Sequence, residues 1–193
     1  MYRCDGAEAV RLSGLPPAGA AEPAILVLGS FPSVRSLELR RYYSHPRNHF
    51  WPIVAALAGV RLPDGYGERL ALLERLGMAL WDVIGACVRP GSLDGDIRDA
   101  AANDVAGFVL ARPSILRVAL NGTMAADRFT RTAAPDLRGA FGRVGEPVAW
   151  RPDPASPRVV TVARLPSTSP VPSGRYRCME DKLPAWLGFL GRA

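Results

Sequence analysis

The sequence has 193 residues, 48% of them hydrophobic and 22% charged, and its formal net charge is +6 at pH 7. This composition is typical of a soluble globular protein, and a membrane-spanning chain is excluded because no apolar run reaches bilayer length. No basic, apolar leader opens the sequence, so we expect a cytoplasmic protein with a single domain over residues 1–193.

Cysteine and lysine are both scarce. Cys4, Cys87 and Cys178 are odd in number and far apart, which argues against a disulfide framework and against a zinc or iron–sulfur site. Of the 24 basic residues only Lys182 is a lysine, so chemistry through a lysine Schiff base has one candidate. The arginines suit a polyanionic partner because the guanidinium fork matches phosphate oxygens, although a GC-rich genome gives the same bias.

Apolar runs and periodic patterns alternate along the chain. In chain order they predict an irregular Gly-, Ala- and Pro-rich arm at 1–23, a strand at 24–29, a turn with a short helix at 30–40, helices at 48–60 and 67–80, and a second strand at 79–88. A loop from residue 91 then leads to a helix starting near Asn103 and Asp104, a strand at 115–122, a helix at 123–133, a loop at 147–157, a strand at 158–166 and a final helix at 176–190.

The helix at 67–80 and the final helix carry further signals. Leu70, Leu73, Leu76 and Leu80 share one face of the first, which we expect to stop near Gly77. Pro184 is expected to interrupt the second. Alternating strands and helices imply an α/β fold with a parallel sheet that is covered on both faces.

Three of the predicted strands run directly into polar turns marked by glycine or proline. These turns are G-S-F-P-S at 29–33, L-N-G at 120–122 and L-P-S-T-S-P at 165–170. Because ligands bind beyond the carboxyl ends of parallel strands, we expect the three turns to meet at one rim and form the site. None of them contains a nucleotide P-loop, a dinucleotide fingerprint or a nucleophile elbow.

Each turn also has a plain structural explanation. The first could be only a tight turn, Asn121 only part of an Asn-Gly turn, and the third only a surface loop. In a site, the small residues of the first would let the backbone approach a ligand closely. The Asn121 carboxamide would offer a donor and an acceptor to the edge of a base, and the hydroxyls of the third would grip phosphates.

The stretch R-Y-Y-S-H-P-R-N-H-F-W-P-I-V at 41–54 collects rings and hydrogen-bonding side chains. We expect Phe50 and Trp51 in the core and Tyr43 as a stacking platform. Asn48 follows a Pro–Arg turn and precedes the aromatic pair, and a polar residue held there needs a partner or a task.

Both histidines of the chain lie in this stretch. His45 and His49 could share a metal ion, but Pro46 lies between them and no carboxylate follows at metalloprotease spacing. We therefore expect no metal site.

Four motifs in this order resemble the uracil-DNA glycosylase superfamily, and most closely its hypoxanthine-DNA (deoxyinosine) glycosylase branch. They are G-S-F-P-S, Y-Y-S-H-P-R-N-H-F-W, A-L-N-G and L-P-S-T-S-P, with W-D-V-I-G-A-C-V-R-P-G-S-L-D at 81–94 as a further matching block. The resemblance covers about residues 24–185. It implies a three-layer α/β/α sandwich with a short central parallel sheet, and enzymes that flip a damaged base out of DNA and hydrolyse its N-glycosidic bond without metal or cofactor.

The resemblance also assigns roles to the matching positions. Phe31 replaces the asparagine that positions water in the mismatch-specific relatives, so this role passes to Asn48. Base binding is assigned to Gly29, Ser30, Phe31, Tyr43 and Asn121. DNA binding is assigned to Ser33, Ser167, Thr168, Ser169, Val171 and Arg175.

Two positions of the last motif depart from the relatives. Leu165 replaces the histidine that opens this motif in the best-known uracil enzymes. Ser169 stands where relatives insert an apolar wedge, so either Val171 takes that part or no strong wedge exists.

The implied reaction creates an oxocarbenium-like sugar and an anionic base. An amide suffices to position water because an oxocarbenium needs little nucleophilic activation. His45 and His49 are further catalytic candidates, as acids for a departing purine nitrogen. Asp82 and Asp94 are expected as scaffold, and the lone Lys182 predicts an enzyme that leaves an abasic site without strand cleavage.

Three other functions remain open at this point. The first is a uracil or mismatch-uracil glycosylase of the same fold. The second is a nucleic-acid-binding module without activity, made conceivable by Phe31, and the third is a small-molecule hydrolase, for which the chain lacks a nucleophile elbow or triad. In the preferred interpretation the partner is DNA, in duplex or single strand, and the enzyme is a monomer.

Overall fold

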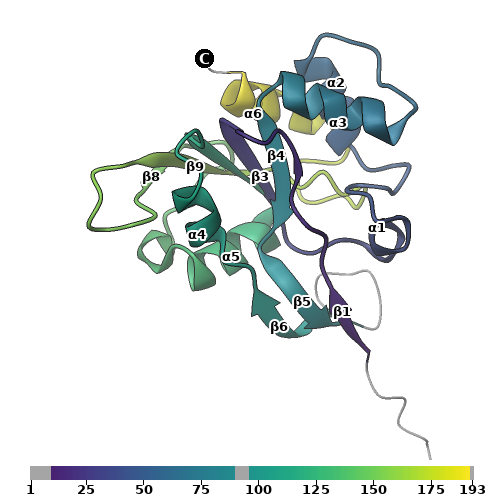
Figure 1. Ribbon diagram of the computed structural model, residues 1–193. Coiled ribbons are helices and arrows are strands. Elements are labelled where there is room, and N and C mark those ends of the chain that lie inside the picture. The colour runs from purple at the N-terminus through teal and green to yellow at the C-terminus, as the bar shows by residue number, and fades with distance from the viewer. Residues whose placement is uncertain (1–9, 90–95, 192–193) are drawn as a thin grey trace, which may run out of the picture.

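The computed structural model describes residues 10–89 and 96–191 (Figure 1). Cys4, Asp94 and the end of the 81–94 block lie outside the described residues. The main sheet has the strand order β2-β4-β3-β7-β9-β8. Its strands are β2 Ala18–Gly19, β3 Ile25–Gly29, β4 Met78–Asp82, β7 Arg117–Asn121, β8 Val148–Trp150 and β9 Val160–Leu165.

The centre of this sheet is parallel, as the alternating pattern predicted. β3 pairs in parallel with β4 and β7, and β7 pairs in parallel with β9. The two edge strands, β2 and β8, are antiparallel, so the sheet as a whole is mixed. The sequence prediction missed both, placing β2 in an irregular arm and β8 in a loop, because strands of two or three residues show no measurable periodicity.

Helices cover both faces of the main sheet (Figure 1). On one face α2 Phe50–Leu57, α3 Tyr66–Arg75 and α6 Met179–Leu190 pack in one core cluster with Ile25 and Val27 of β3. On the other face α4 Val105–Leu110 and α5 Thr123–Thr132 pack with Leu26 and Leu28. Both faces of β3 are therefore buried, which explains its uninterrupted apolar sequence. The α/β/α layering predicted from the resemblance is confirmed.

A second, antiparallel sheet extends from the first. It consists of β1 Arg11–Ser13, β5 Ile84–Val88 and β6 Arg98–Ala102, in the order β1-β5-β6. The predicted strand at 79–88 is thus two strands, β4 and β5, which separate at Val83 and belong to different sheets. β1 and β6 were not predicted, and β6 is an exposed, Ala-rich edge strand of low β propensity.

Two predictions about the helices differ from the structure, the end of α3 and the effect of Pro184 on α6, and one, the cap of α4, agrees. α3 ends at Arg75, and Gly77 adopts φ +60°, the left-handed conformation that commonly terminates helices. Leu80 therefore lies in β4, not on the face of the preceding helix. Pro184 lies inside α6 without ending it, so the expected interruption was wrong. Asp104 caps α4 as predicted, its side chain accepting a hydrogen bond from the amide of Gly107.

The remaining helical segments are α1 Val34–Leu39, which Ser33 caps, and the 3-10 turn Pro135–Leu137. Over residues 10–89 and 96–191, no helix has both the length and the apolar character needed to cross a bilayer.

Candidate active site

A cavity of about 580 Å³ lies at the carboxyl ends of the parallel strands. Segments 29–33, 42–48 and 167–173 provide most of its lining, and Asp82 and Asn121 complete it from the ends of β4 and β7. Its volume lies within the range of about 300–1,000 Å³ that is usual for small-molecule sites. The three polar turns that follow the strands meet here, and Asn48 and Asn121 face the same space.

The first turn, Gly29–Ser33, is held tightly against the end of β4. Val83 and Ile84 donate backbone hydrogen bonds to the carbonyls of Gly29 and Ser30, at 2.9 and 3.0 Å. A Cβ atom on Gly29 would collide with the Asp82 carboxylate, so any other residue at this position would force that side chain to shift. Phe31 is 6% exposed and contributes to both the wall of the cavity and the core below it.

Tyr43 and Asn121 are joined in a hydrogen-bond network with Thr168. The Nδ2 group of Asn121 donates to the Tyr43 hydroxyl at 3.1 Å and to Oγ1 of Thr168 at 2.9 Å. The amide of Thr168 donates to Oδ1 of Asn121 at 2.8 Å. Both donor hydrogens of the Asn121 carboxamide are therefore used within the protein, and one acceptor position of Oδ1 remains for a ligand.

Tyr43 is positioned by its backbone and by a second ring. Its φ of +52° is unusual for a residue with a side chain, and its ring stacks on Phe50 with centroids 4.1 Å apart. Burial and the nearby Asp82 carboxylate raise the pKa of Tyr43 well above its usual value, so the hydroxyl keeps its proton at neutral pH. Phe50 and Trp51 are 0% and 2% exposed, which confirms their predicted place in the core.

Asn48 is fixed at the start of α2. Its backbone amide donates to the carbonyl of His45 at 2.9 Å, and its Oδ1 accepts from the amide of Phe50 at 2.9 Å. In the described part of the chain the Nδ2 group of Asn48 has no partner, and the side chain is half-buried in the cavity wall. The carboxamide is thus held in one orientation while retaining free hydrogen-bonding capacity.

The two histidines have different surroundings. His45 lines the cavity, and its Nδ1 accepts from the amide of Arg47 at 3.2 Å. His49 is not among the lining residues: Nζ of Lys182 lies 3.1 Å from its Nδ1. Burial, and next the Lys182 ammonium, lower the pKa of His49 below its usual value. The structure therefore places His45 at the cavity and His49 behind its wall.

Lys182 is also not among the residues that line the cavity. It is 1% exposed, and its Nζ donates to the carbonyl of Ser169 at 2.7 Å. Burial lowers the pKa of its ammonium group. Trp186, one turn along α6, donates to the carbonyl of Pro166 at 3.0 Å. α6 thus holds the 165–170 loop from behind.

The residues assigned to DNA binding occupy different positions along this loop. Ser167, Thr168 and Ser169 all line the cavity, and Thr168 is fully buried there and bonded to Asn121. Val171 lies on the rim with 60% of its surface exposed, a suitable position for an apolar wedge. Arg175 does not line the cavity, and its guanidinium donates to the hydroxyl of Tyr176 at 2.8 Å.

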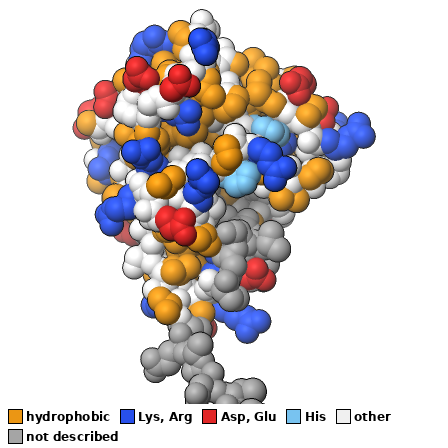
Figure 2. All heavy atoms as spheres, turned by 90° about the vertical axis from the view of Figure 1, so that its right-hand side faces the viewer, with side chains coloured by type: hydrophobic (Ala, Val, Ile, Leu, Met, Phe, Trp, Pro, Cys, Tyr) orange, Lys and Arg blue, Asp and Glu red, His pale blue; other side chains and the backbone are white. Residues whose placement is uncertain are grey.

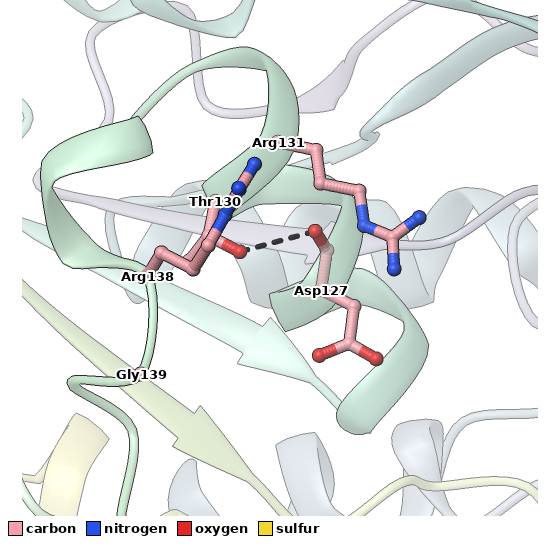
Figure 3. Close-up of a pocket in the computed structure, with 5 residues that line it drawn as sticks. All are labelled: Asp127, Thr130, Arg131, Arg138 and Gly139. Carbon is pink, nitrogen blue, oxygen red and sulfur yellow. Dashed lines mark hydrogen bonds between the residues drawn. The ribbon is translucent and has the colours of Figure 1, made fainter.

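A second hollow of about 440 Å³ lies on α5 and the turn after it (Figure 3). It is lined by Asp127, Thr130, Arg131, Arg138 and Gly139. Thr130 donates to the backbone carbonyl of Asp127 within its own helix. The hollow contains no aromatic ring on which a base could stack, so it does not share the character of the cavity at the strand ends. Within residues 10–89 and 96–191, no three His, Cys, Asp or Glu side chains gather as metal ligands.

Comparison with known proteins agrees with this geometry. No protein-family model matches the chain. A protein named hypoxanthine DNA glycosylase from Methanosarcina acetivorans is 36% identical over 115 residues, which are 59% of this chain and 73% of that protein. A protein of the same name from Methanosarcina barkeri is 34% identical over 114 residues, 58% of this chain and 72% of that protein. The chain belongs to the hypoxanthine DNA glycosylase family, within the uracil-DNA glycosylase superfamily.

A solved structure extends the family likeness to the fold. The solution NMR structure of a candidate uracil DNA glycosylase from Methanosarcina acetivorans superimposes with a TM-score of 0.62 and 31% sequence identity. The match covers 83% of this chain and 86% of that chain. The family resemblance inferred from four short motifs is thereby confirmed.

Sequence reasoning about this family member named Lys182 without predicting its contacts behind the site, and it missed the role of Arg89. Lys182 shares the buried face of α6 with Trp186, Phe189 and Leu190, a spacing of four, seven and eight residues that marks it as an inward-facing lysine. Arg89 lies behind the first turn, where its Nη2 donates to the carbonyl of Pro32 at 2.6 Å. A lone arginine after an apolar strand gave no such signal, because its partner is 57 residues away in the chain.

Proposed function

We propose that this chain is a monofunctional DNA glycosylase that releases hypoxanthine from deoxyinosine in DNA and so initiates base excision repair. The observation that carries the proposal is one cavity lined by Asn48, Tyr43, Phe31 and Asn121 at the ends of the parallel strands. Two relatives bear the name hypoxanthine DNA glycosylase, which supports hypoxanthine as the base.

In the proposed reaction the flipped nucleotide places its base against Tyr43 and the Gly29–Ser33 turn. The bond between the base nitrogen and C1′ breaks, and its electron pair leaves with the base. Asn48 positions a water molecule whose oxygen bonds to C1′, and the water proton passes to solvent or to the departing base. The products are free hypoxanthine and an abasic site in DNA.

The Asn48 carboxamide suits this role because its oxygen already accepts from the Phe50 amide and is held still. A fixed amide can orient water, and the oxocarbenium-like sugar requires little further activation. His45, which lines the cavity, is the candidate for protonating a departing purine nitrogen. His49 faces Lys182, so we propose for it a supporting part in place of acid catalysis.

The enzyme is proposed to be monofunctional because Lys182 is buried behind the wall and bonded to Ser169 and His49. A lysine that forms an imine with the sugar must reach C1′, and strand cleavage would follow. We also propose that the enzyme acts as a monomer, in the cytoplasm and without a metal ion or cofactor. Activity retained in excess chelator and a monomeric mass in solution would support these points.

A base-release assay tests the proposal directly. Matched oligonucleotides carry inosine, xanthine or uracil at one position, in single strands and in duplexes, and abasic sites are revealed by alkaline cleavage. The proposal expects fastest release from inosine and no strand cleavage before alkali. Faster release from uracil would favour the second candidate function, a uracil glycosylase. The name of the similar solved structure is the reason for considering this candidate.

An Asn48→Ala variant separates catalysis from binding alone. We expect release to fall by roughly 10²–10³-fold while duplex binding is retained. A wild-type protein that binds DNA but releases none of the three bases would instead identify a nucleic-acid-binding module and refute the proposal.

A further inference from the structure

A cationic side chain is buried directly behind the cavity wall. Arg89 follows β5 and is 5% exposed. Its guanidinium carbon lies 5.0 Å from the centre of the Phe31 ring, and its Nη2 donates to the carbonyl of Pro32 at 2.6 Å. Both Phe31 and Pro32 line the cavity. The charge is therefore separated from the cavity by one ring and one peptide group.

Burying this charge costs desolvation free energy, and a purely structural role would offset little of that cost. A cation removed from water is normally paired with a carboxylate. Among residues 10–89 and 96–191, no carboxylate forms an ion pair with Arg89, and its buried Nε has no hydrogen-bond partner. A neutral donor could hold the Pro32 carbonyl at a smaller desolvation cost, so the charge itself calls for an explanation.

The peptide group between Pro32 and Ser33 binds Arg89 through its carbonyl oxygen, which leaves its N–H group, that of Ser33, to be considered. Because a trans peptide is planar, a Pro32 carbonyl directed at Arg89 turns the N–H of Ser33 the opposite way. In the described part of the chain, neither the Ser33 amide nor the Phe31 amide donates a hydrogen bond within the protein. Both residues line the cavity. The turn therefore offers two amide donors, and Arg89 orients and polarises one of them.

The proposed reaction creates negative charge on this side of the cavity. The departing base takes the bonding electron pair, and no side chain of the Gly29–Ser33 turn itself carries a positive charge. Leu165 stands at the start of the last motif and is 1% exposed, so it supplies no donor. Asp82, 4% exposed at the same wall, adds an unfavourable negative charge. A cation behind the turn would offset both.

We propose that Arg89 is a positioning residue that stabilises the negative charge developing on the departing base, acting through the Pro32–Ser33 peptide and across the Phe31 ring. This inference rests on the proposed function. It adds a positive electrostatic contribution that arises outside the cavity lining, from the 81–94 block of the family resemblance.

The test uses pairs of departing bases that differ in acidity. Oligonucleotides carry hypoxanthine or xanthine, and uracil or 5-fluorouracil, where the second base of each pair forms the more stable anion. Single-turnover release rates are measured for the wild type, Arg89→Met and Arg89→Lys. If Arg89 stabilises the anion, Arg89→Met slows the less acidic base of a pair by roughly tenfold more than the more acidic base. Arg89→Lys, which keeps the charge, gives a smaller change in that ratio.

Arg158→Met is the matched control. Arg158 is half-buried and donates to the carbonyls of Val109, Arg112 and Ile115, away from the cavity. Its loss is expected to lower stability without changing the rate ratio within a pair. The inference is overturned if Arg89→Met slows the release of both bases of a pair equally. It is also overturned if Arg158→Met changes the rate ratio within a pair while Arg89→Lys leaves that ratio unchanged.

Two outcomes separate this inference from the proposed function. A folded wild-type protein that releases none of the four bases overturns the function and the inference together. An active wild type whose ratios survive Arg89→Met overturns only the role of Arg89. Should Arg89→Met fail to fold, Arg89→Gln takes its place, because glutamine keeps a donor for the Pro32 carbonyl while removing the charge. A rate ratio in Arg89→Gln equal to that of the wild type would then overturn the inference.

Discussion

Asn121 holds the 165–170 loop in addition to its proposed role in base binding. Its carboxamide makes three hydrogen bonds, one with Tyr43 and two with Thr168, and Thr168 is fully buried. A base edge can therefore reach only one remaining acceptor position on Oδ1, unless the network opens. Recognition of a base N–H by this single position suits hypoxanthine, whose N1 carries a hydrogen, better than adenine.

Asn121→Ala is expected to lower stability as well as activity. It leaves the buried amide of Thr168 without an acceptor, and an unsatisfied buried donor costs about 1–3 kcal/mol. Asn48→Ala is the matched comparison, because Asn48 accepts only one hydrogen bond, at the half-buried start of α2. Denaturant unfolding of the two variants should show the larger loss for Asn121→Ala. Equal losses would contradict the interpretation of Asn121 as the residue that locks the loop.

The contact between His49 and Lys182 predicts a pH dependence of stability. Burial and the Lys182 ammonium hold the pKa of folded His49 below its usual value of 6.5, so the unfolded chain binds the proton more readily. Stability is then lost as pH falls below about 6.5, until the folded histidine also takes up a proton. Denaturant unfolding of the wild type between about pH 5 and 7 measures this loss.

His49→Gln removes the titrating group and keeps an acceptor for Nζ of Lys182. This variant should therefore show a flatter stability profile than the wild type. Glu180, whose charge favours the protonated form of His49, is present in both proteins and does not change the comparison. His45→Gln is the control, because His45 lines the cavity and does not face Lys182. If His45→Gln flattened the profile and His49→Gln did not, the assignment would be wrong.

At the scale of elements, α6 acts as a support for the 165–170 loop. Trp186→Phe keeps a ring in the core but leaves the carbonyl of Pro166 without its donor. We expect a loss of about 1–3 kcal/mol in stability and weaker binding of duplex DNA, because the loop is less well held. Trp150→Phe on the other face of the sheet is the control, and it should destabilise without weakening DNA binding. Thermal unfolding and fluorescence anisotropy measure the two effects.

The central elements could be predicted from the sequence because their patterns are local. β3 is an uninterrupted apolar run, β7 has an apolar centre of three residues, and Asp104 directly precedes the helix it caps. β6 was missed because R-D-A-A-A has neither apolar alternation nor β-branched residues. Leu80 was misassigned because it continues the leucine spacing of α3, and only the left-handed Gly77 breaks that series.

In the candidate site, too, the features with a local sequence pattern could be predicted and the others could not. A motif at the end of β7 pointed to Asn121 and a motif before α2 pointed to Asn48, and both residues line one cavity. The bonds that hold those residues join positions far apart in the chain, such as Asn121 with Thr168 and His49 with Lys182. No local pattern encodes such pairings, so they could only be found in three dimensions.

At the scale of the whole molecule, basic side chains surround the face that carries both histidines (Figure 2). Arg35, Arg40, Arg41 and Arg47 are exposed on or near segment 42–48, which lines the cavity. Together with the net charge of +6, this distribution suits a DNA duplex held across the cavity mouth.

The expected consequence is a strong salt dependence of duplex binding. Replacing Arg41 and Arg47 with glutamine should reduce the slope of log affinity against log salt by about 1 for each lost phosphate contact. Replacing Arg131 and Arg138 of the second hollow should leave the slope unchanged. A reduced slope in the second pair and an unchanged slope in the first would place the DNA on a different face.

One continuous segment passes from β4 through Val83 into β5 and changes sheets on the way. It delivers the Asp82 carboxylate to the Gly29 end of the Gly29–Ser33 turn and the Arg89 guanidinium to its Pro32 end, while its own amides hold the turn in place. Substitutions within this one segment, at Asp82 or Arg89, would therefore change the electric field at a departing base. In the proposed reaction, water placement by Asn48 would be left untouched by such a change, because Asn48 belongs to a different segment of the lining, just before α2.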